Sequence, residues 1–251
     1  MNQLKQVLSA LVVLLILFGS TGYAQDQSVT EYAYVADFKI NYGDMMDWME
    51  SHYEYTVPVL NSLQEDGIIT GWSVWQHNTG SDYNWRMVFN TSGWANINNF
   101  WNTYFERMPA EAMESSMGMI EAHRDNIYVS AAYQYAEDAN IKYAYESQFH
   151  INFSDLEAWN EVWAEKMKPV IEGQMSSGNS AGYYIGDHST GNKYNRIQVY
   201  FFEDWDHIDD FNAALMGSML SDPEEWKTTG SLVQSHDDII WELVPYEIAA
   251  E

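Results

Sequence analysis

Histidine side chains are the first candidates for chemistry in this chain, because an imidazole gains and loses a proton near neutral pH. Two of the seven histidines stand in similar surroundings, in the runs His123-Arg124-Asp125 and His236-Asp237-Asp238. A carboxylate this close could orient the imidazole as a general base. The alternative is that both histidines are ordinary polar residues in a loop that leads from a helix to a strand.

A third histidine, His52, interrupts an apolar pattern. It lies at helical spacing between Trp48 and Val59, and the residue 111 positions further along the chain is Trp163. A polar ring therefore stands where a core aromatic ring would be expected. Either His52 belongs to a functional site, or it is a buried histidine whose hydrogen bonds are satisfied within the core.

Polar side chains also occupy one face of two predicted strands, whose other face carries tyrosine and phenylalanine. These polar residues are Asp37 and Lys39 in the first strand, and Glu146, Gln148 and His150 in the second. Burying charged groups is costly unless they are paired or hydrated. The pattern therefore predicts a polar, water-containing interior that could bind a ligand, unless this face is exposed because the two sheets never close on each other.

Two arginines on predicted strands differ from the residues at the matched positions. Arg86 corresponds to Ile197, and Arg196 corresponds to Trp85. Each guanidinium could bind an anionic group of a ligand through two hydrogen bonds, or pair with one of the many carboxylates of the protein. The sequence does not decide between these two roles.

The elements that must position these residues come from an internal repeat. At an offset of 111 residues, Tyr32-Ala33-Tyr34 matches Tyr143-Ala144-Tyr145, and further matches include Trp48 with Trp159, Pro58 with Pro169 and Gly80 with Gly191. Each copy shows the pattern strand, helix, strand, strand, helix, strand. The predicted boundaries are 29–133 for the first repeat, 134–141 for a linker and 142–251 for the second repeat. The last strands of the two copies are predicted at 127–131 and 239–244.

Two successive βαββαβ units correspond to the ferredoxin-like plan. Together with the hairpin sequence Gly71-Trp72-Ser73-Val74-Trp75, this element order resembles the dimeric α+β barrel superfamily, in which two such sheets face each other across a barrel. The tandem arrangement looks like the chlorite-dismutase type, where one chain supplies both halves. The predicted fold class is therefore α+β, with two tandem ferredoxin-like repeats whose antiparallel sheets form an intramolecular barrel.

The resemblance also implies functional roles. In related barrels, a histidine at the start of the last strand acts as a general base on a polyketide-like substrate, which makes His123 and His236 candidates. Some relatives bind haem through a single histidine, but tryptophan and tyrosine at these spacings are more often core residues. The sequence has no His-x-His, no His-Glu-x-x-His and no cysteine. We therefore expect neither a cofactor nor a metal site.

The beginning of the chain has the features of an export signal. Lys5 precedes an apolar run from Leu8 to Phe18, and the small residues before Gln25 form a cleavage site, so residues 1–24 are predicted to be a signal peptide. The run is shorter than the roughly 20 residues of a membrane-spanning helix, so no membrane anchor is expected after cleavage. We therefore expect an exported protein, periplasmic or extracellular.

The charge balance limits the partners of this protein. The chain has 11 Lys+Arg against 37 Asp+Glu, a net charge of −26. Nucleic acid is excluded as a partner because its binding requires a basic surface, and anionic lipid is disfavoured for the same reason. The acidity indicates either a cationic partner or a strongly hydrated surface.

Three functions are compatible with these patterns. The favoured one is an exported small-molecule-binding protein with an aromatic-lined pocket. The first alternative is a cofactor-independent enzyme of the monooxygenase or cyclase type, in which His52, His123 or His236 is the base. The second alternative is a structural or interaction module without a pocket. A cavity containing a histidine within hydrogen-bond reach of a carboxylate would favour the enzyme. Neither the ligand nor the oligomeric state follows from the sequence.

Overall fold

A computed structural model describes residues 30–245 of the chain. The predicted signal peptide lies outside the described residues. The strands are β1 (Tyr32–Ile40), β2 (Gly71–Thr79), β3 (Trp85–Thr91), β4 (Ile120–Tyr135), β5 (Tyr143–Ile151), β6 (Gly182–Thr190), β7 (Arg196–Phe202) and β8 (Val233–Leu243). The α-helices are α2 (Met45–Ser51), α3 (Val57–Glu65), α4 (Trp94–Arg107), α5 (Ala110–Met119), α6 (Leu156–Val162), α7 (Lys168–Ser176), α8 (Asp206–Ser221) and α9 (Pro223–Leu232).

The strands form a closed antiparallel barrel in the order β1-β3-β2-β8-β5-β7-β6-β4. The first four strands of the chain are neighbours in the order β4-β1-β3-β2, and the last four follow the same pattern as β8-β5-β7-β6. The pairs β2 with β8 and β4 with β6 join the two groups. The expectation that the sheets might not close is therefore wrong, and the predicted α+β barrel is the observed architecture.

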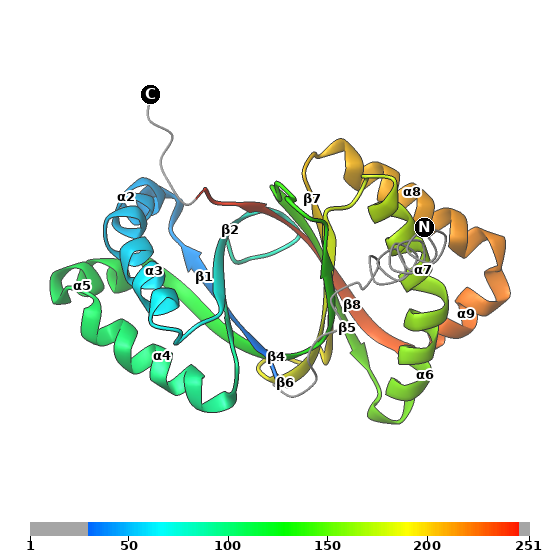
Figure 1. The fold of residues 1–251 in the computed structure, drawn as a ribbon, viewed down its shortest axis with the longest axis horizontal. Coiled ribbons are helices and arrows are strands. Elements are labelled where there is room, and N and C mark those ends of the chain that lie inside the picture. The colour runs from blue at the N-terminus through cyan, green and yellow to red at the C-terminus, as the bar shows by residue number, and fades with distance from the viewer. Residues whose placement is uncertain (1–29, 246–251) are drawn as a thin grey trace, which may run out of the picture.

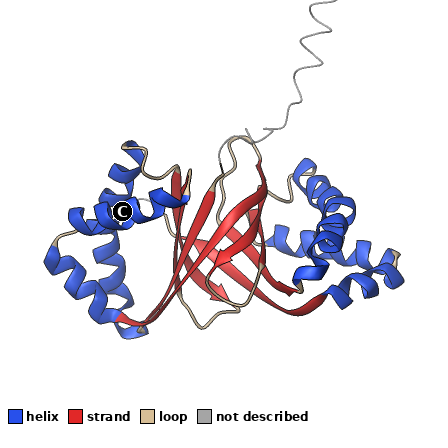
Figure 2. Ribbon diagram, turned by 90° about the horizontal axis from the view of Figure 1, so that it is seen from below, coloured by secondary structure: helices blue, strands red, loops and turns tan. Residues whose placement is uncertain are grey.

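Helices cover the barrel on two opposite sides, as Figures 1 and 2 show. Helices α2 to α5 lie on the strands of the first half, and α6 to α9 lie on those of the second half. One apolar cluster lies between sheet and helices in each half, and a third lies inside the barrel. The strands are therefore covered on both faces where they pass between the helices and the barrel interior, which explains why five consecutive residues of β1, 33–37, are buried.

The long helical segment of each half changes its winding just before the proline that the two repeats share. In the first half, a π-helical turn, η2 (His52–Thr56), separates α2 from α3, and Pro58 lies in the first turn of α3. In the second half, η4 (Trp163–Met167) precedes Pro169 in the same way. Proline lacks an N–H and its ring collides with the carbonyl one turn earlier, so a widened turn accommodates it. The widened turn of the first half begins at His52.

The last strand of each half starts earlier than the sequence predicts. We expected these strands at 127–131 and 239–244, but β4 begins at Ile120 and β8 begins at Val233. The first part of each strand is rich in charged residues, which resembles a loop in the sequence, but pairing with β1 and β5 keeps it extended. His123 and His236 therefore lie within strands rather than in the loops before them.

Candidate functional site

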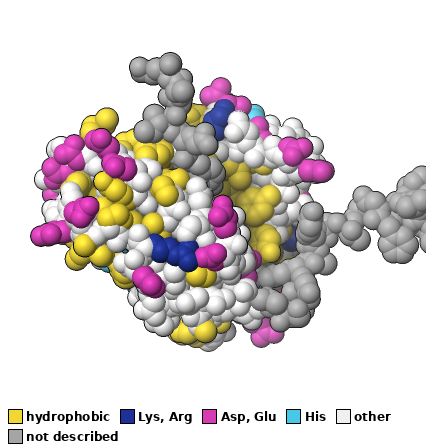
Figure 3. Space-filling model, turned by 60° about the vertical axis from the view of Figure 1, so that its left-hand side comes forward, with side chains coloured by type: hydrophobic (Ala, Val, Ile, Leu, Met, Phe, Trp, Pro, Cys, Tyr) yellow, Lys and Arg dark blue, Asp and Glu magenta, His cyan; other side chains and the backbone are white. Residues whose placement is uncertain are grey.

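A cavity of about 550 Å³ lies between the helices and the sheet of the first half. This volume is within the range of about 300–1,000 Å³ that is typical of small-molecule sites. Its walls are mostly aromatic rings and methionines, and its ionisable groups include His52, His123 and Asp125. Phe105 and Met117 line the cavity and are exposed, which places its opening between α4 and α5. Figure 3 shows acidic side chains among exposed hydrophobic ones on this side of the molecule.

A continuous series of rings joins the two histidines along the cavity wall. The ring of His123 stacks on Phe38 with a centroid distance of 4.9 Å, and Phe38 contacts Trp48 at 5.8 Å. Trp48 meets Trp85 edge-on at 6.1 Å, and Trp85 meets His52 edge-on at 5.2 Å. Flat rings on one wall favour a flat aromatic ligand, because such a ligand can stack or make edge contacts with them.

His52 is a buried neutral base on the helix side of the cavity. Burial lowers its pKa to about 4, so the ring is uncharged at neutral pH. No charged side chain contributes to this shift, and the described residues form no hydrogen bond to the ring. The interpretation of His52 as a core histidine with satisfied hydrogen bonds is therefore wrong.

His123 forms a pair with Asp125 on the sheet side of the cavity. The two residues are two positions apart on β4, so their side chains point to the same face, and Nε2 of His123 lies 2.8 Å from Oδ1 of Asp125. The hydrogen bond with Asp125 is the main cause that raises the pKa of His123, against the effect of partial burial. His123 is thus a stronger base than an isolated histidine, and Asp125 fixes its orientation.

A buried donor on the wall completes the polar groups of the cavity. The indole Nε1 of Trp48 is shielded from solvent and has no hydrogen-bond partner among the described residues. An unsatisfied buried N–H is costly, so a ligand oxygen at this position would be stabilised. The sequence shows Trp48 only as part of an apolar stripe and gives no sign of this role.

The second half repeats the histidine pair but has a tryptophan at the position of His52. His236 lies 3.4 Å from Asp238 on β8 and stacks on Phe149. Trp163, at the position of His52, packs against Tyr183 in the core. The second half also differs at the position of Trp85, where it has an arginine. Arg196 stands at the position of Trp85, on the helix side of the sheet, donates a hydrogen bond of 2.6 Å to Asn160 and pairs with Asp187.

Four of the predicted ligand-binding residues come together inside the barrel instead. They are Asp37, Arg86, Glu146 and Gln148. Nε of Arg86 donates to Asp37 at 2.6 Å, Nη1 of Arg86 pairs with Glu146, and Gln148 donates to Glu146. Arg124, which the sequence did not single out, adds a bond of 2.8 Å to Asp37. The predicted polar interior is therefore present as a network of ion pairs.

The charges of this network favour its ionised form. Burial alone would raise the pKa of Asp37, but the neighbouring charges of Arg86 and Arg124 lower it. Arg86 remains protonated because Asp37 and Glu146 outweigh its loss of hydration. Of the two roles left open for Arg86, the structure shows the pairing with carboxylates.

Lys39 and His150 do not join the interior. The amino group of Lys39 pairs with Glu121 at 3.2 Å near the surface, and His150 lies opposite Ser235, half-buried, at the end of β5. Both residues immediately precede a register shift in the strand pairing. Such irregularities change the direction of the strand, which carries these two side chains away from the interior.

Haem fits this cavity poorly. His52 could serve as a single axial ligand, but neither lysine nor arginine is among the residues that line the cavity, so haem propionates would find no cationic partner there. The carboxylate of Asp125 would instead repel them. Within residues 30–245, no group of three or more His, Asp or Glu side chains is arranged to hold a metal ion. None of the helices in the same residues combines the length and apolar character needed to cross a membrane.

Comparison with known proteins gives the fold. No protein-family model and no curated protein matches the sequence. In structure, the chain is similar to a protein from Fusobacterium nucleatum proposed to be a monooxygenase, with a TM-score of 0.60, 11% identity, and coverage of 87% of this chain and 94% of that chain. This chain and the protein from Fusobacterium nucleatum share the α+β barrel fold.

Two further solved structures support the same conclusion. An anthrone oxidase-like protein has a TM-score of 0.56 at 7% identity and covers 90% of this chain and 98% of its own. A mutant chlorite dismutase from Candidatus Nitrospira defluvii, in complex with cyanide, has a TM-score of 0.56 at 11% identity and covers 86% and 91%.

Proposed function

We propose that the cavity of the first half binds a flat, weakly acidic aromatic molecule and that His123 removes a proton from it. The observation that carries this proposal is the His123–Asp125 pair at 2.8 Å on the wall of a cavity of about 550 Å³. A positioned histidine near its working pH contributes about 10²–10⁴-fold to the rate of a proton transfer. The enzyme alternative thus replaces binding alone as the favoured function, and the cavity argues against a module without a pocket.

His52 and Trp48 are proposed to bind the oxygen of the ligand. The Nε1 hydrogen of Trp48 lacks an acceptor, and the imidazole of His52 is neutral and lacks a partner among the described residues. Neutral donors can stabilise negative charge that develops on an oxygen when a neighbouring carbon or hydroxyl loses its proton. The surrounding rings hold the molecule in a plane.

The reaction that best uses this arrangement is oxygenation of a methylene group activated by aromatic rings, as in an anthrone. His123 takes one proton from the methylene carbon, and the resulting anion reacts with dioxygen. The CH₂ group and O₂ become C=O and H₂O, so that the carbon is oxidised and O₂ is reduced. The names of the similar monooxygenase and anthrone oxidase-like proteins support this class at low sequence identity.

The evolutionary and cellular parts of the proposal rest on the sequence. We propose that the two halves are tandem copies of one ferredoxin-like unit, which the matched residues and the shared strand order support. We also propose that residues 1–24 direct export and are then removed.

Oxygen uptake with anthrone as the substrate tests the proposed base. We expect His123→Ala to lower the rate by about 10²–10⁴-fold, because the proton acceptor is lost. His236→Ala is the matched control, since His236 has the same aspartate neighbour but lies in the other half, and its rate should equal that of the native protein. Equal effects of the two substitutions would contradict the proposal.

Binding is tested separately by quenching of tryptophan fluorescence with anthrone under nitrogen. The variant His52→Trp places in the first half the residue found at position 163, and we expect it to weaken quenching because the larger ring narrows the cavity and the imidazole is lost. Retention of full affinity in this variant would place the ligand elsewhere.

A further inference from the structure

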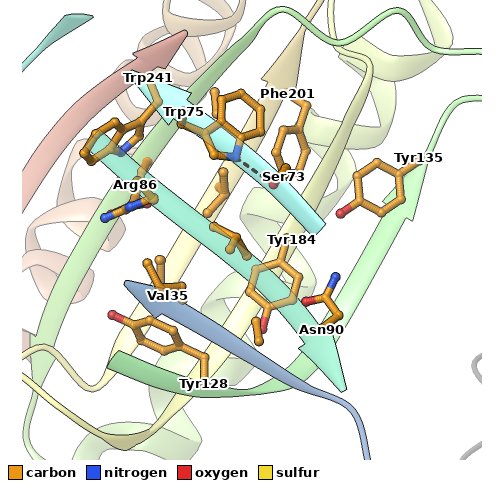
Figure 4. Close-up of a pocket in the computed structure, with 16 residues that line it drawn as sticks. Val35, Ser73, Trp75, Arg86, Asn90, Tyr128, Tyr135, Tyr184, Phe201 and Trp241 are labelled. Carbon is orange, nitrogen blue, oxygen red and sulfur yellow. Dashed lines mark hydrogen bonds and ion pairs between the residues drawn. The ribbon is translucent and has the colours of Figure 1, made fainter. Parts of the chain in front are cut away.

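A second cavity, of about 100 Å³, lies inside the barrel. It lies on the opposite face of β1, β3 and β4 from the proposed active site. A ligand bound here would therefore be separate from the substrate proposed above. Both halves form its walls, with Val35 and Val88 from the first half and Ile197, Val199 and Phe201 from the second. Figure 4 shows these strands enclosing a group of aromatic rings. The cavity is thus mainly apolar.

The inner end of this cavity is polar but has no excess charge. Figure 4 shows Arg86 between Trp241 and Tyr128, and Cζ of Arg86 lies 4.1 Å from the centroid of the Trp241 ring. The positive charges of Arg86 and Arg124 are balanced by Asp37 and Glu146. A charged ligand would lose its hydration here without gaining a free counter-charge.

Two buried donors at this end lack partners. The hydroxyl of Tyr128 and the Nε1 of Trp241 form no hydrogen bond within residues 30–245, and both side chains belong to residues that are only 1% exposed. Both residues line the cavity. An indole N–H can only donate, so Trp241 requires an acceptor oxygen or nitrogen. Burial raises the pKa of Tyr128, so its hydroxyl keeps its proton and can also donate.

The other end of the cavity leads to the surface. Ser73, Asn90 and Tyr135 line it and are partly or fully exposed, and Figure 4 places them away from Arg86 and Trp241. The cavity therefore has an apolar middle, an accessible end and an inner end with two free donors.

We propose that the barrel interior is a second binding site, specific for a small uncharged organic molecule that carries an oxygen, such as a phenol or a short ketone. An apolar cavity of ~150 Å³ holds benzene in another protein, so this smaller cavity takes a single ring only if part of the ring extends into its accessible end. The ligand oxygen accepts a hydrogen bond from Trp241, and its apolar part contacts the valines and Phe201.

Phenol and benzene are suitable probes because they differ only in the hydroxyl. The indole N–H signal of Trp241, assigned in an NMR spectrum by its disappearance in Trp241→Phe, reports on this cavity alone. We expect phenol to shift this signal in a saturable manner, with about tenfold weaker binding of benzene, because one hydrogen bond is lost.

Variants that close one cavity at a time identify the site. Val88→Phe fills the barrel cavity, and Asn90→Trp blocks its accessible end without changing the core. We expect both to abolish the effect of phenol, whereas His52→Trp, which narrows the other cavity, should not change it. The proposal is overturned if phenol leaves the Trp241 signal unchanged, if its effect survives Val88→Phe and Asn90→Trp, or if a crystal soaked in phenol holds only water there.

Discussion

A single histidine, His52, connects the stability of this protein to pH. Its pKa of about 4 in the folded protein is below the value of about 6.5 that it has when unfolded. A group with a lowered pKa binds its proton more readily in the unfolded state. Protonation therefore destabilises the fold as the pH falls below about 6.5, and this effect levels off below about pH 4.

We accordingly expect the native protein to lose about 2 kcal/mol of unfolding free energy through His52 between about pH 7.5 and about pH 5. The variant His52→Phe lacks the titrating group and should show a smaller loss by this amount. Urea unfolding of both proteins at the two pH values measures the difference. Parallel losses in the two proteins would show that His52 does not titrate in this way.

Removing one partner from the ion pairs inside the barrel should destabilise the folded protein strongly, because the remaining charges stay buried. Asp37 accepts hydrogen bonds from Arg86 and Arg124, so Asp37→Ala leaves two guanidinium groups short of a partner. We expect it to lower the unfolding free energy by about 3–5 kcal/mol. Lys39→Ala, two positions away, removes only a surface pair and should cost less than about 1 kcal/mol. Similar costs in chemical denaturation would contradict this distinction.

At the scale of elements, a glycine turn from each half supports the histidine strand of the other. An added Cβ at Gly191, after β6, would lie 2.7 Å from the carbonyl oxygen of Asp125 on β4. An added Cβ at Gly80, after β2, would lie 2.2 Å from that of Asp238 on β8. Both glycines have positive φ, which other residues rarely adopt. The two turns are matched in the sequence, but they touch different histidine pairs.

This arrangement predicts unequal effects on activity. Gly191→Ala should displace the strand that holds His123 and Asp125, and lower the oxygenation rate by at least tenfold. Gly80→Ala should destabilise the protein by a similar amount, of about 1–3 kcal/mol, but retain the activity of its folded fraction. Thermal unfolding and oxygen uptake of both variants separate stability from activity. Equal activities of the two folded variants would argue against a supporting role for the Gly191 turn.

The order of the elements could be predicted because it depends on local patterns. The alternation in β1 and β5 and the turn glycines are visible in the sequence, and the repeat confirms each of them. The starts of β4 and β8 could not be predicted, because the segment around Arg124 is polar and only pairing with β1 makes it a strand. For the same reason, the His123–Asp125 pair appeared as two loop residues rather than as neighbours on one face.

The site itself was only partly predictable. The mismatch of His52 with Trp163 is visible in the sequence, and His52 lines the cavity of the first half. The unpaired Nε1 of Trp48 and the pairing of Arg124 depend on which atoms find partners in three dimensions. The sequence has no pattern for such contacts, because any residue nearby in space can satisfy or leave open a hydrogen bond.

On the scale of the whole molecule, the net charge of −26 should oppose the compact state. Salt screens repulsion between surface charges over about 10 Å at about 0.1 M and over about 3 Å at about 1 M. We expect the midpoint of thermal unfolding to rise by several degrees between about 0.01 M and about 1 M sodium chloride. A midpoint that is independent of salt would show that the surface charges are already compensated.

Closure of the barrel within one chain has a consequence for how the protein responds to dilution. The joining pairs β2 with β8 and β4 with β6 connect sheets that belong to the same polypeptide. In a barrel built from two separate chains, these contacts would follow mass action and weaken as the concentration falls. Here the covalent link gives each sheet a constant effective concentration of the other. The barrel and both cavities should therefore persist in very dilute solution, a property that would suit a protein released into a large volume.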